Sequence, residues 1–200
     1  RKESSAASDV YKRQVLLQDR PNAQGLSLRI DWLDIISFAD QMPACMYAGA
    51  EMDGGALRGW TRYDAEQRGQ RSVMAVKQDV KLLNDNIVRL TVVEALRRIM
   101  ARRELRVADI DWFLPHYSSE FFRERLAAGL AEVDLPIPMA RWFTNLTSKG
   151  NTGAASIFII LDELFNGGHL RSGQRLLCYV PESGRFSSAF MHLTVVGDEA

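Results

Sequence analysis

Strand-like and helix-like segments alternate along this chain, and that alternation limits the possible folds more than any other feature of the sequence. Apolar residues recur at steps of three and four from Val73 to Leu96, which predicts a helix. The other predicted helices cover residues 118–130 and 152–165. The predicted strands cover residues 15–18, 26–37, 112–114, 174–180 and 188–196. This order, which ends in two consecutive strands, indicates an α/β layered domain.

Composition and charge exclude several classes of protein. The chain has 200 residues, and its 25 Lys and Arg balance its 25 Asp and Glu, so the formal net charge is zero. A nucleic-acid partner or a polybasic membrane patch is therefore not expected. No apolar run approaches the roughly 20 residues that cross a bilayer. The two cysteines, Cys45 and Cys178, are too few for a disulfide framework, and we expect a cytoplasmic location.

Residues 1–14 differ from the rest of the chain because they are polar and have no periodicity. The stretch "SSAASDVYKRQ" looks like a translated sequencing adapter, and the alternative is a disordered native tail. The first interpretation implies that the native sequence here starts inside a fold. Residues 40–70 are rich in Gly, Met and Arg, and we expect a long connection that could line a substrate site.

Two polar side chains stand at the ends of predicted elements. His116 follows Pro115, which closes a buried strand because proline has no amide hydrogen, and strand ends are where open α/β sheets bind ligands. Asn151 precedes a helix whose first turn holds only small residues. An imidazole N–H and an amide NH₂ aimed at one point would stabilise a carbonyl oxygen that becomes negative, as in enolate chemistry. The alternative is a core histidine and an ordinary helix N-cap.

The stretches around these residues resemble the C-terminal half of ketoacyl-ACP synthase III and its thiolase-fold relatives. "WFLPH" matches a family pattern like "IPHQAN", and "GNTGAASIFIILDEL" matches one like "GNTSAASIPLALDE". The resemblance runs from about Val73 to Val196. It implies the C-terminal half of an αβαβα architecture with a mixed five-stranded sheet. It divides the chain into a leader (1–14), the end of the N-terminal half with its connecting loop (15–72) and the C-terminal domain (73–200).

The resemblance also implies a chemistry, the decarboxylative Claisen condensation of an acyl thioester with a malonyl thioester. His116 and Asn151 match the residues that stabilise the enolate. Ser183 and Gly184 lie in the turn that matches the family's oxyanion and tunnel turn. Implied substrates and partners are acyl carrier protein and coenzyme A thioesters, with no further cofactor, no metal and a homodimer at full length. The implied pathway is fatty-acid or secondary-metabolite biosynthesis.

Some residues depart from the family pattern. Ser119 stands where the family has an asparagine, which puts the contact with the pantetheine arm in doubt. The turn that is glycine-rich in the family holds Glu182 and Arg185 here, so we expect a remodelled tunnel mouth. The nucleophilic cysteine of the family lies upstream of this chain's residues, so the chain is expected to be an inactive fragment. The second interpretation is a non-catalytic partner subunit of a heteromeric synthase.

The remaining candidates have ordinary structural explanations. Cys178 lies in an apolar strand and Cys45 has no partner signature, so neither is expected to be the nucleophile. We expect His169 to be solvated in a loop and His192 to be a half-buried structural residue. Arg123 and Arg125 form a basic face on the helix after His116, which is either solvated or a contact for an acidic carrier protein. The carrier contact is what the resemblance implies, because the related enzymes dock that partner near this helix, whereas the other interpretations come from position in the predicted elements.

Overall fold

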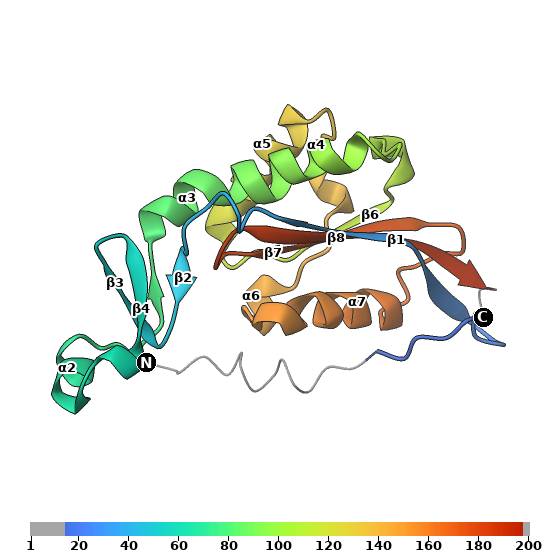
Figure 1. The fold of residues 1–200 in the computed structure, drawn as a ribbon. Coiled ribbons are helices and arrows are strands. Elements are labelled where there is room, and N and C mark those ends of the chain that lie inside the picture. Colours follow the sequence, from blue (N-terminus) through green and yellow to red (C-terminus); the bar gives the residue numbers. More distant parts are fainter. Residues whose placement is uncertain (1–14, 198–200) are drawn as a thin grey trace.

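The computed structural model describes residues 15–197, which form a mixed sheet with helices on both faces (Figure 1). The strand order in the main sheet is β1-β8-β7-β6. Strands β1 and β8 pair antiparallel, as do β7 and β8, whereas β6 and β7 are parallel. The bounds of these strands are Leu26–Ser37 (β1), Trp112–Pro115 (β6), Arg175–Glu182 (β7) and Ser187–Gly197 (β8). The predicted α/β class and mixed sheet are confirmed, while residues 1–14 lie outside the described part.

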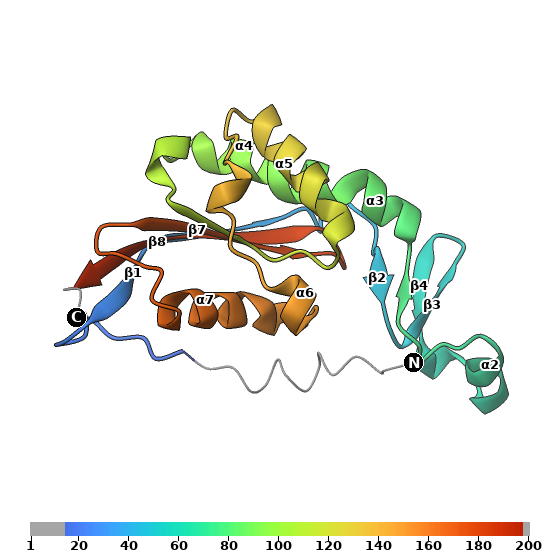
Figure 2. The same ribbon diagram turned by 180° about the vertical axis from the view of Figure 1, so that it is seen from behind.

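Helices cover the two faces of the sheet in separate layers (Figures 1 and 2). One layer holds the run α3–η2–α4, in which η2 is a π-helix, and α5; the other holds α6 and α7. The bounds are Val80–Val88 (α3), Arg89–Glu94 (η2), Ala95–Met100 (α4), Arg123–Glu132 (α5), Leu146–Lys149 (α6) and Ser156–Asn166 (α7). Short 3₁₀ turns are Trp60–Arg62 (η1), Val107–Asp109 (η3), Glu120–Phe122 (η4), Met139–Arg141 (η5) and Gly153–Ala155 (η6).

The long helix predicted from Val73 begins only at Val80. Asp79 has extended backbone angles, and its side chain accepts a hydrogen bond from the Leu82 amide at 2.9 Å, which is a helix N-cap. The residues just before it, Lys77–Gln78 (β5), pair with Met46–Tyr47 (β2). That pairing holds the backbone extended, so the apolar periodicity before residue 80 does not become helical.

One predicted strand is not formed in the described part of the chain. Residues 15–18 have no strand pairing and are exposed. The main sheet has four strands where five were expected, and a fifth is reduced to one bridge between Phe113 and Trp142. Pro136 and Pro138 supply no amide hydrogens for a ladder, and η5 coils the backbone just before the bridge.

Residues 46–79 form an arm that extends from the main body (Figures 1 and 2). It contains the β2–β5 pair, a hairpin of Ala50–Asp53 (β3) with Ala56–Gly59 (β4), and the helix Ala65–Gln70 (α2). The predicted long connection is therefore folded in part. The arm is anchored to the main body where it begins, since the amides of Cys45 and Met46 donate hydrogen bonds to the Gly184 carbonyl at 2.7 and 3.4 Å.

Successive side chains of β7 point to opposite faces of the sheet and pack into two separate cores. Leu177 and Tyr179 belong to the larger cluster under α4 and α5, and Leu176 and Cys178 belong to the smaller cluster against α7. A strand buried on both faces reads as a continuous apolar run, as "LLCYV" does. The main sheet is therefore the middle layer of a three-layer sandwich.

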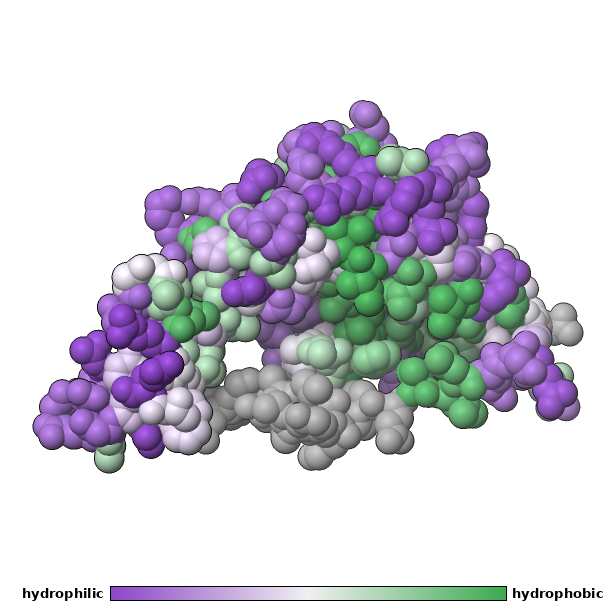
Figure 3. All heavy atoms as spheres, in the orientation of Figure 1, coloured by the Kyte–Doolittle hydropathy of each residue, from purple (hydrophilic) through white to green (hydrophobic). Residues whose placement is uncertain are grey.

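The α7 layer covers only part of its face of the sheet. Helix α7 packs mainly against β6 and β7, at the edge of the sheet opposite to β1. Along β1 the exposed fraction on the α7 side rises from 46% at Ile30 to 52% at Leu33 and 70% at Ile35. Figure 3 shows hydrophobic residues gathered at the sheet edge where β1 runs. A bulge between Ile30 and Trp32 keeps Ile30, Leu33 and Ile35 on one face. We call these three residues the β1 apolar face.

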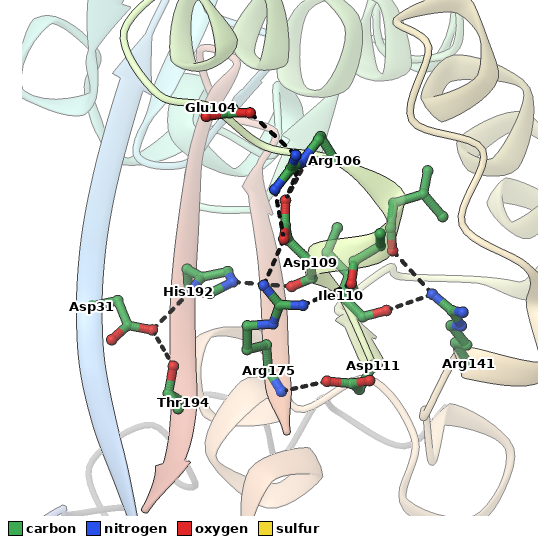
Figure 4. Close-up of polar contacts among 12 residues, drawn as sticks. Asp31, Glu104, Arg106, Asp109, Ile110, Asp111, Arg141, Arg175, His192 and Thr194 are labelled. Atoms are coloured by element: carbon green, nitrogen blue, oxygen red, sulfur yellow. Dashed lines mark hydrogen bonds and ion pairs between the residues drawn. The ribbon is translucent and has the colours of Figure 1, made fainter. Parts of the chain in front are cut away.

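Near the start of β6, polar groups join β1, β8 and η3, and His192 among them is buried (Figure 4). His192 contacts Asp31 through Nδ1 at 2.9 Å and the Asp109 carbonyl oxygen through Nε2 at 3.3 Å. Its ring stacks on Trp32 with centroids 5.6 Å apart. Arg175 donates to the Asp109 carboxylate at 2.5 Å. His192 is therefore a structural residue, although it is buried where half-burial was predicted.

Candidate functional site

A pocket of about 480 Å³ opens where β6 and β7 end, between the α3–α5 layer and the start of α7. His116, Asn151 and Ser183 all line it, so the structure brings three of the predicted site residues together. Most of the remaining wall is apolar and comes from Leu83, Ile87, Val88, Phe122, Leu126 and Tyr179. A largely apolar cavity with a few converging polar groups is typical of a small-molecule site.

His116 is fixed at the end of β6 by its backbone. Its amide donates to the Tyr179 carbonyl at 2.8 Å, so the residue continues the parallel pairing that Pro115 could not. The side chain is buried, with 9% exposed, and burial lowers the pKa of His116 to about 4. The imidazole is therefore neutral at pH 7, with one nitrogen that donates and one that accepts.

Asn151 is held by a tight local turn. Gly150, with φ of 76°, reverses the chain after α6, a conformation that favours glycine. The Asn151 Oδ1 then accepts from the Gly153 amide at 3.0 Å. This bond fixes the side-chain oxygen and leaves the NH₂ group as the free, donating end. Asn151 is exposed and lines the pocket. The helix predicted to begin at Thr152 starts instead as the 3₁₀ turn η6 and is α-helical only from Ser156.

The turn between β7 and β8 is more constrained than the sequence suggests. The Gly184 amide donates to the carboxylate of Glu182, and the Arg185 amide donates to the same carboxylate at 3.3 Å. Ser183 and Glu182 line the pocket, but Gly184 is not part of its wall. An incoming oxyanion that uses the Gly184 amide would therefore have to displace Glu182.

Ser119 and Arg123 lie outside the pocket wall. The Ser119 hydroxyl accepts from the Phe121 amide at 3.3 Å and caps η4, and Arg123 lies 3.6 Å from Glu120 in an ion pair. The wall has Ser118 instead. Arg125 packs its guanidinium over the exposed ring of Phe121, 4.1 Å from the centroid.

Tyr179 is a pocket residue that sequence reasoning did not single out. Its hydroxyl is 2.6 Å from the Thr91 hydroxyl, which lies in the π-helix η2, and Thr91 also donates to the Ile87 carbonyl at 2.5 Å. Single π-helical turns inside α-helices are frequent at functional sites. The sequence signal for Tyr179 was only its place in the apolar run of β7, which does not distinguish a wall residue from core.

Neither cysteine is placed to be a nucleophile. Both are buried and neither lines the pocket. The Cys45 Sγ donates to the Asp79 carbonyl at 3.3 Å, and burial, with the nearby charges of Asp79 and Glu182, raises the pKa of Cys45. Burial raises the pKa of Cys178 to about 12. A thiol that stays protonated is a weak nucleophile.

Other features of the described residues add no second site. His169 is exposed, as predicted, near the rings of Trp112 and Phe143. Within residues 15–197, no group of three or more His, Cys, Asp or Glu is arranged to hold a metal ion. Among the helices described, none combines the length and the apolar character that crossing a membrane requires.

Comparison with known proteins gives consistent matches. Residues 100–187 match the family described as the C-terminal part of 3-oxoacyl-acyl-carrier-protein synthase III. The β-ketoacyl-acyl-carrier-protein synthase III of Laribacter hongkongensis is 30% identical over 186 residues, covering 85% of this chain and 56% of that protein. Synthase III 3 of Streptomyces coelicolor is 38% identical over 84 residues, covering 42% of this chain and 24% of that protein.

A solved structure shares the fold. The 3-oxoacyl-(acyl carrier protein) synthase III of Pseudomonas aeruginosa superposes with a TM-score of 0.57 at 21% identity, covering 84% of this chain and 46% of that one. The chain thus spans roughly half, or less, of the length of these relatives.

Proposed function

Since this chain carries a C-terminal portion of the β-ketoacyl-ACP synthase III kind, with a thiolase-like fold, we propose that it forms half of an acyl-thioester condensing enzyme. The reaction is the decarboxylative Claisen condensation of an acyl thioester with a malonyl thioester. The observation that carries the proposal is the meeting of His116 and Asn151 in one largely apolar pocket.

In this mechanism the malonyl thioester loses CO₂, and its thioester carbonyl becomes an enolate. The neutral His116 donates through one ring nitrogen, and the free NH₂ of Asn151 donates to the same oxygen. The enolate carbon then attacks the carbonyl of the acyl group bound to the enzyme nucleophile, and the thiolate of that nucleophile leaves. A buried, neutral imidazole suits this role because it donates without adding a charge that needs solvation.

The nucleophile that carries the acyl group is assigned to a cysteine in the part of the relatives that this chain does not match. Cys45 and Cys178 are excluded from that role by burial and raised pKa. Acyl carrier protein or coenzyme A delivers both thioesters, the full-length protein is a homodimer, and it acts in the cytoplasm. The carrier contacts the basic face of Arg123 and Arg125 near the pocket.

The occupied amide of Gly184 supports a second candidate, a non-catalytic partner subunit. In a heteromeric synthase such a subunit would retain the pocket but would not catalyse the condensation. Retention of both enolate donors favours the enzyme, because a subunit without chemistry has no need of that pair.

The experiment uses the full-length parent protein with malonyl and acyl thioesters. His116→Ala and Asn151→Ala should each lower the rates of decarboxylation and condensation by about 10²–10³, as expected for one lost donor. Acyl loading should fall less, and the double variant should be little worse than the worse single one. His169→Ala, at an exposed histidine, is the control and should be unchanged. Condensation rates that survive both substitutions would leave only the partner-subunit function.

A further inference from the structure

His116 lines a second, much smaller cavity in addition to the pocket. This cavity measures about 10 Å³, which is room for about one water molecule. It lies between the end of β6, the segment before α6 and the first turn of α7. Besides His116, the polar residues that line it are Tyr117, Thr144, Asn145 and Ser156, and its apolar wall includes Pro115 and Ile160. We call it the rear cavity.

Asn145 has an unusual arrangement for its position. It is the N-cap residue of α6, yet its side chain makes no cap hydrogen bond. Instead its Nδ2 donates to Glu163 Oε2 of α7 at 2.7 Å. An ionised carboxylate only accepts, so this contact fixes which end of the amide is nitrogen. No hydrogen-bond partner is found for the Oδ1 end among residues 15–197; the residue as a whole is 7% exposed, and Oδ1 is not among the fully enclosed atoms, so a water molecule can reach it.

The proposed function, on which this inference rests, makes a demand on His116 that no described side chain meets. To donate to the enolate, the imidazole must carry its proton on the nitrogen that faces the pocket. The other nitrogen must then accept, and the tautomer is set by the hydrogen bond made there. No side chain in the described part of the protein hydrogen-bonds to the His116 ring, although the residue is only 9% exposed.

We infer that Asn145, oriented by Glu163, positions His116 through a water molecule bound in the rear cavity. The water donates one proton to the Asn145 Oδ1 and the other to the rear nitrogen of His116. The chain Glu163–Asn145–water–His116 then places the single imidazole proton on the pocket side. Asn145 and Glu163 are positioning residues in this arrangement, since neither lines the pocket.

The kinetic test uses the full-length protein. Asn145→Ala and Glu163→Ala should lower the decarboxylation rate by at least about tenfold, because the wrong tautomer cannot donate. The KM for the malonyl thioester should change little, and the acid limb of the pH–rate profile should shift. Glu163→Gln should restore most of the rate, because its amide oxygen still accepts from Asn145.

The chain offers a matched control in the same helix. Asn166 Nδ2 donates to Asp162 Oδ1 at 2.8 Å, an amide–carboxylate pair of the same kind that touches neither cavity. Asn166→Ala should leave the rate and the pH profile unchanged. Equal losses in Asn145→Ala and Asn166→Ala would assign the effect to helix stability and overturn the inference.

A second readout does not depend on activity. With ¹⁵N-labelled histidine, His116 should show one tautomer in the unsubstituted protein and a mixture in Asn145→Ala and Glu163→Ala. Glu163 is exposed, so its replacement should not prevent folding. A single, unchanged tautomer in both variants would refute the positioning role even if His116→Ala abolishes condensation. Tautomer mixing in an inactive protein would support the positioning role and reject only the proposed reaction.

Discussion

The carboxylate of Asp31 shows how one residue joins strands that are distant in sequence. Its Oδ2 accepts from the Thr194 hydroxyl at 2.6 Å and contacts His192 Nδ1 at 2.9 Å, and its Oδ1 accepts from Arg29 at 2.8 Å. Burial by itself would raise the pKa of Asp31, but these donors together hold that pKa below its usual 3.8. The charged form of Asp31 is therefore favoured in the folded state, and folding stability is linked to its ionisation.

We expect Asp31→Asn to lower the free energy of unfolding by about 1–3 kcal/mol at pH 7, because charge-assisted hydrogen bonds are lost. A depressed folded pKa gives stability that is present above the unfolded pKa and is lost as pH falls through the folded value. The difference between the two proteins should therefore shrink below about pH 4. Urea unfolding followed by tryptophan fluorescence measures it, since Trp32 stacks on His192.

A surface aspartate serves as the comparison for this measurement. Asp85 pairs with Lys81 one helical turn away, and both are exposed. Asp85→Asn should leave the unfolding midpoint nearly unchanged at both pH values. A pH-independent loss in Asp31→Asn would instead mean that packing, and not the ionised carboxylate, explains its effect.

At the scale of elements, α5 lies unusually close to the run formed by α3 and η2. A β-carbon built on Gly129 would lie 2.7 Å from Val88 Cγ1 and 3.5 Å from Val92 Cγ1. Glycine is a poor helix former, but here it lets two helices approach without a side chain between them. The same approach places Val88 in the pocket wall.

Gly129→Ala should lower the free energy of unfolding by about 1–3 kcal/mol, because overpacking outweighs the gain in helix propensity. Gly69→Ala, in α2, is the matched control because a β-carbon there has no neighbour within 4 Å. That substitution should not lower stability. Thermal unfolding of the two variants decides the point, and equal midpoints would show that Val88 yields without strain.

The boundaries of an element were predicted well where a local feature of the sequence determines them. They were predicted less well where backbone pairing with a distant strand determines them. Pro115, for example, marked the real end of β6. The start of the long helix was placed at Val73 because apolar spacing cannot register the β2–β5 pairing that keeps Lys77 extended. No local feature of the sequence indicated that η2 would be a π-helix. It depends on packing, in which Thr91 reaches Tyr179 far along the chain.

The candidate site shows the same division. Proximity of His116, Asn151 and Ser183 was predicted from the family resemblance, and the structure places all three at one pocket. The occupation of the Gly184 amide by Glu182 was not foreseen, because the sequence shows a charged residue in the turn but not its direction. Asn145 read as an ordinary polar residue, since its partner Glu163 lies 18 positions away in another helix.

At the scale of the whole molecule, the β1 apolar face has no described element packed against it. Ile30, Leu33 and Ile35 lie on an edge strand, beside the part of the sheet that α7 does not reach. Contiguous exposed apolar surface and an open strand edge both favour association with another chain. In the full-length protein we expect this face to be covered by the half that this chain does not match.

Residues 15–200 alone should therefore self-associate. Leu33→Lys with Ile35→Lys should reduce the apparent mass in sedimentation and raise the soluble fraction. Met74→Lys with Val76→Lys adds the same charge at exposed apolar positions of the arm and should have a much smaller effect. A monodisperse, cooperatively melting monomer of the unsubstituted chain would contradict the proposal that it is half of a larger fold.

The pairing of β1 with β8 also sets the order in which the protein can mature on the ribosome. The contact between Asp31 and His192 joins residues 161 positions apart, and β8 is the neighbour of β1 in the sheet. Within residues 15–197, β1 is therefore made long before its partner β8, and the backbone edge of β1 that pairs with β8 stays unpaired until β8 has been synthesised. Late closure of this kind leaves a nascent chain dependent on chaperones, so its yield in a cell should follow their supply as much as its final stability.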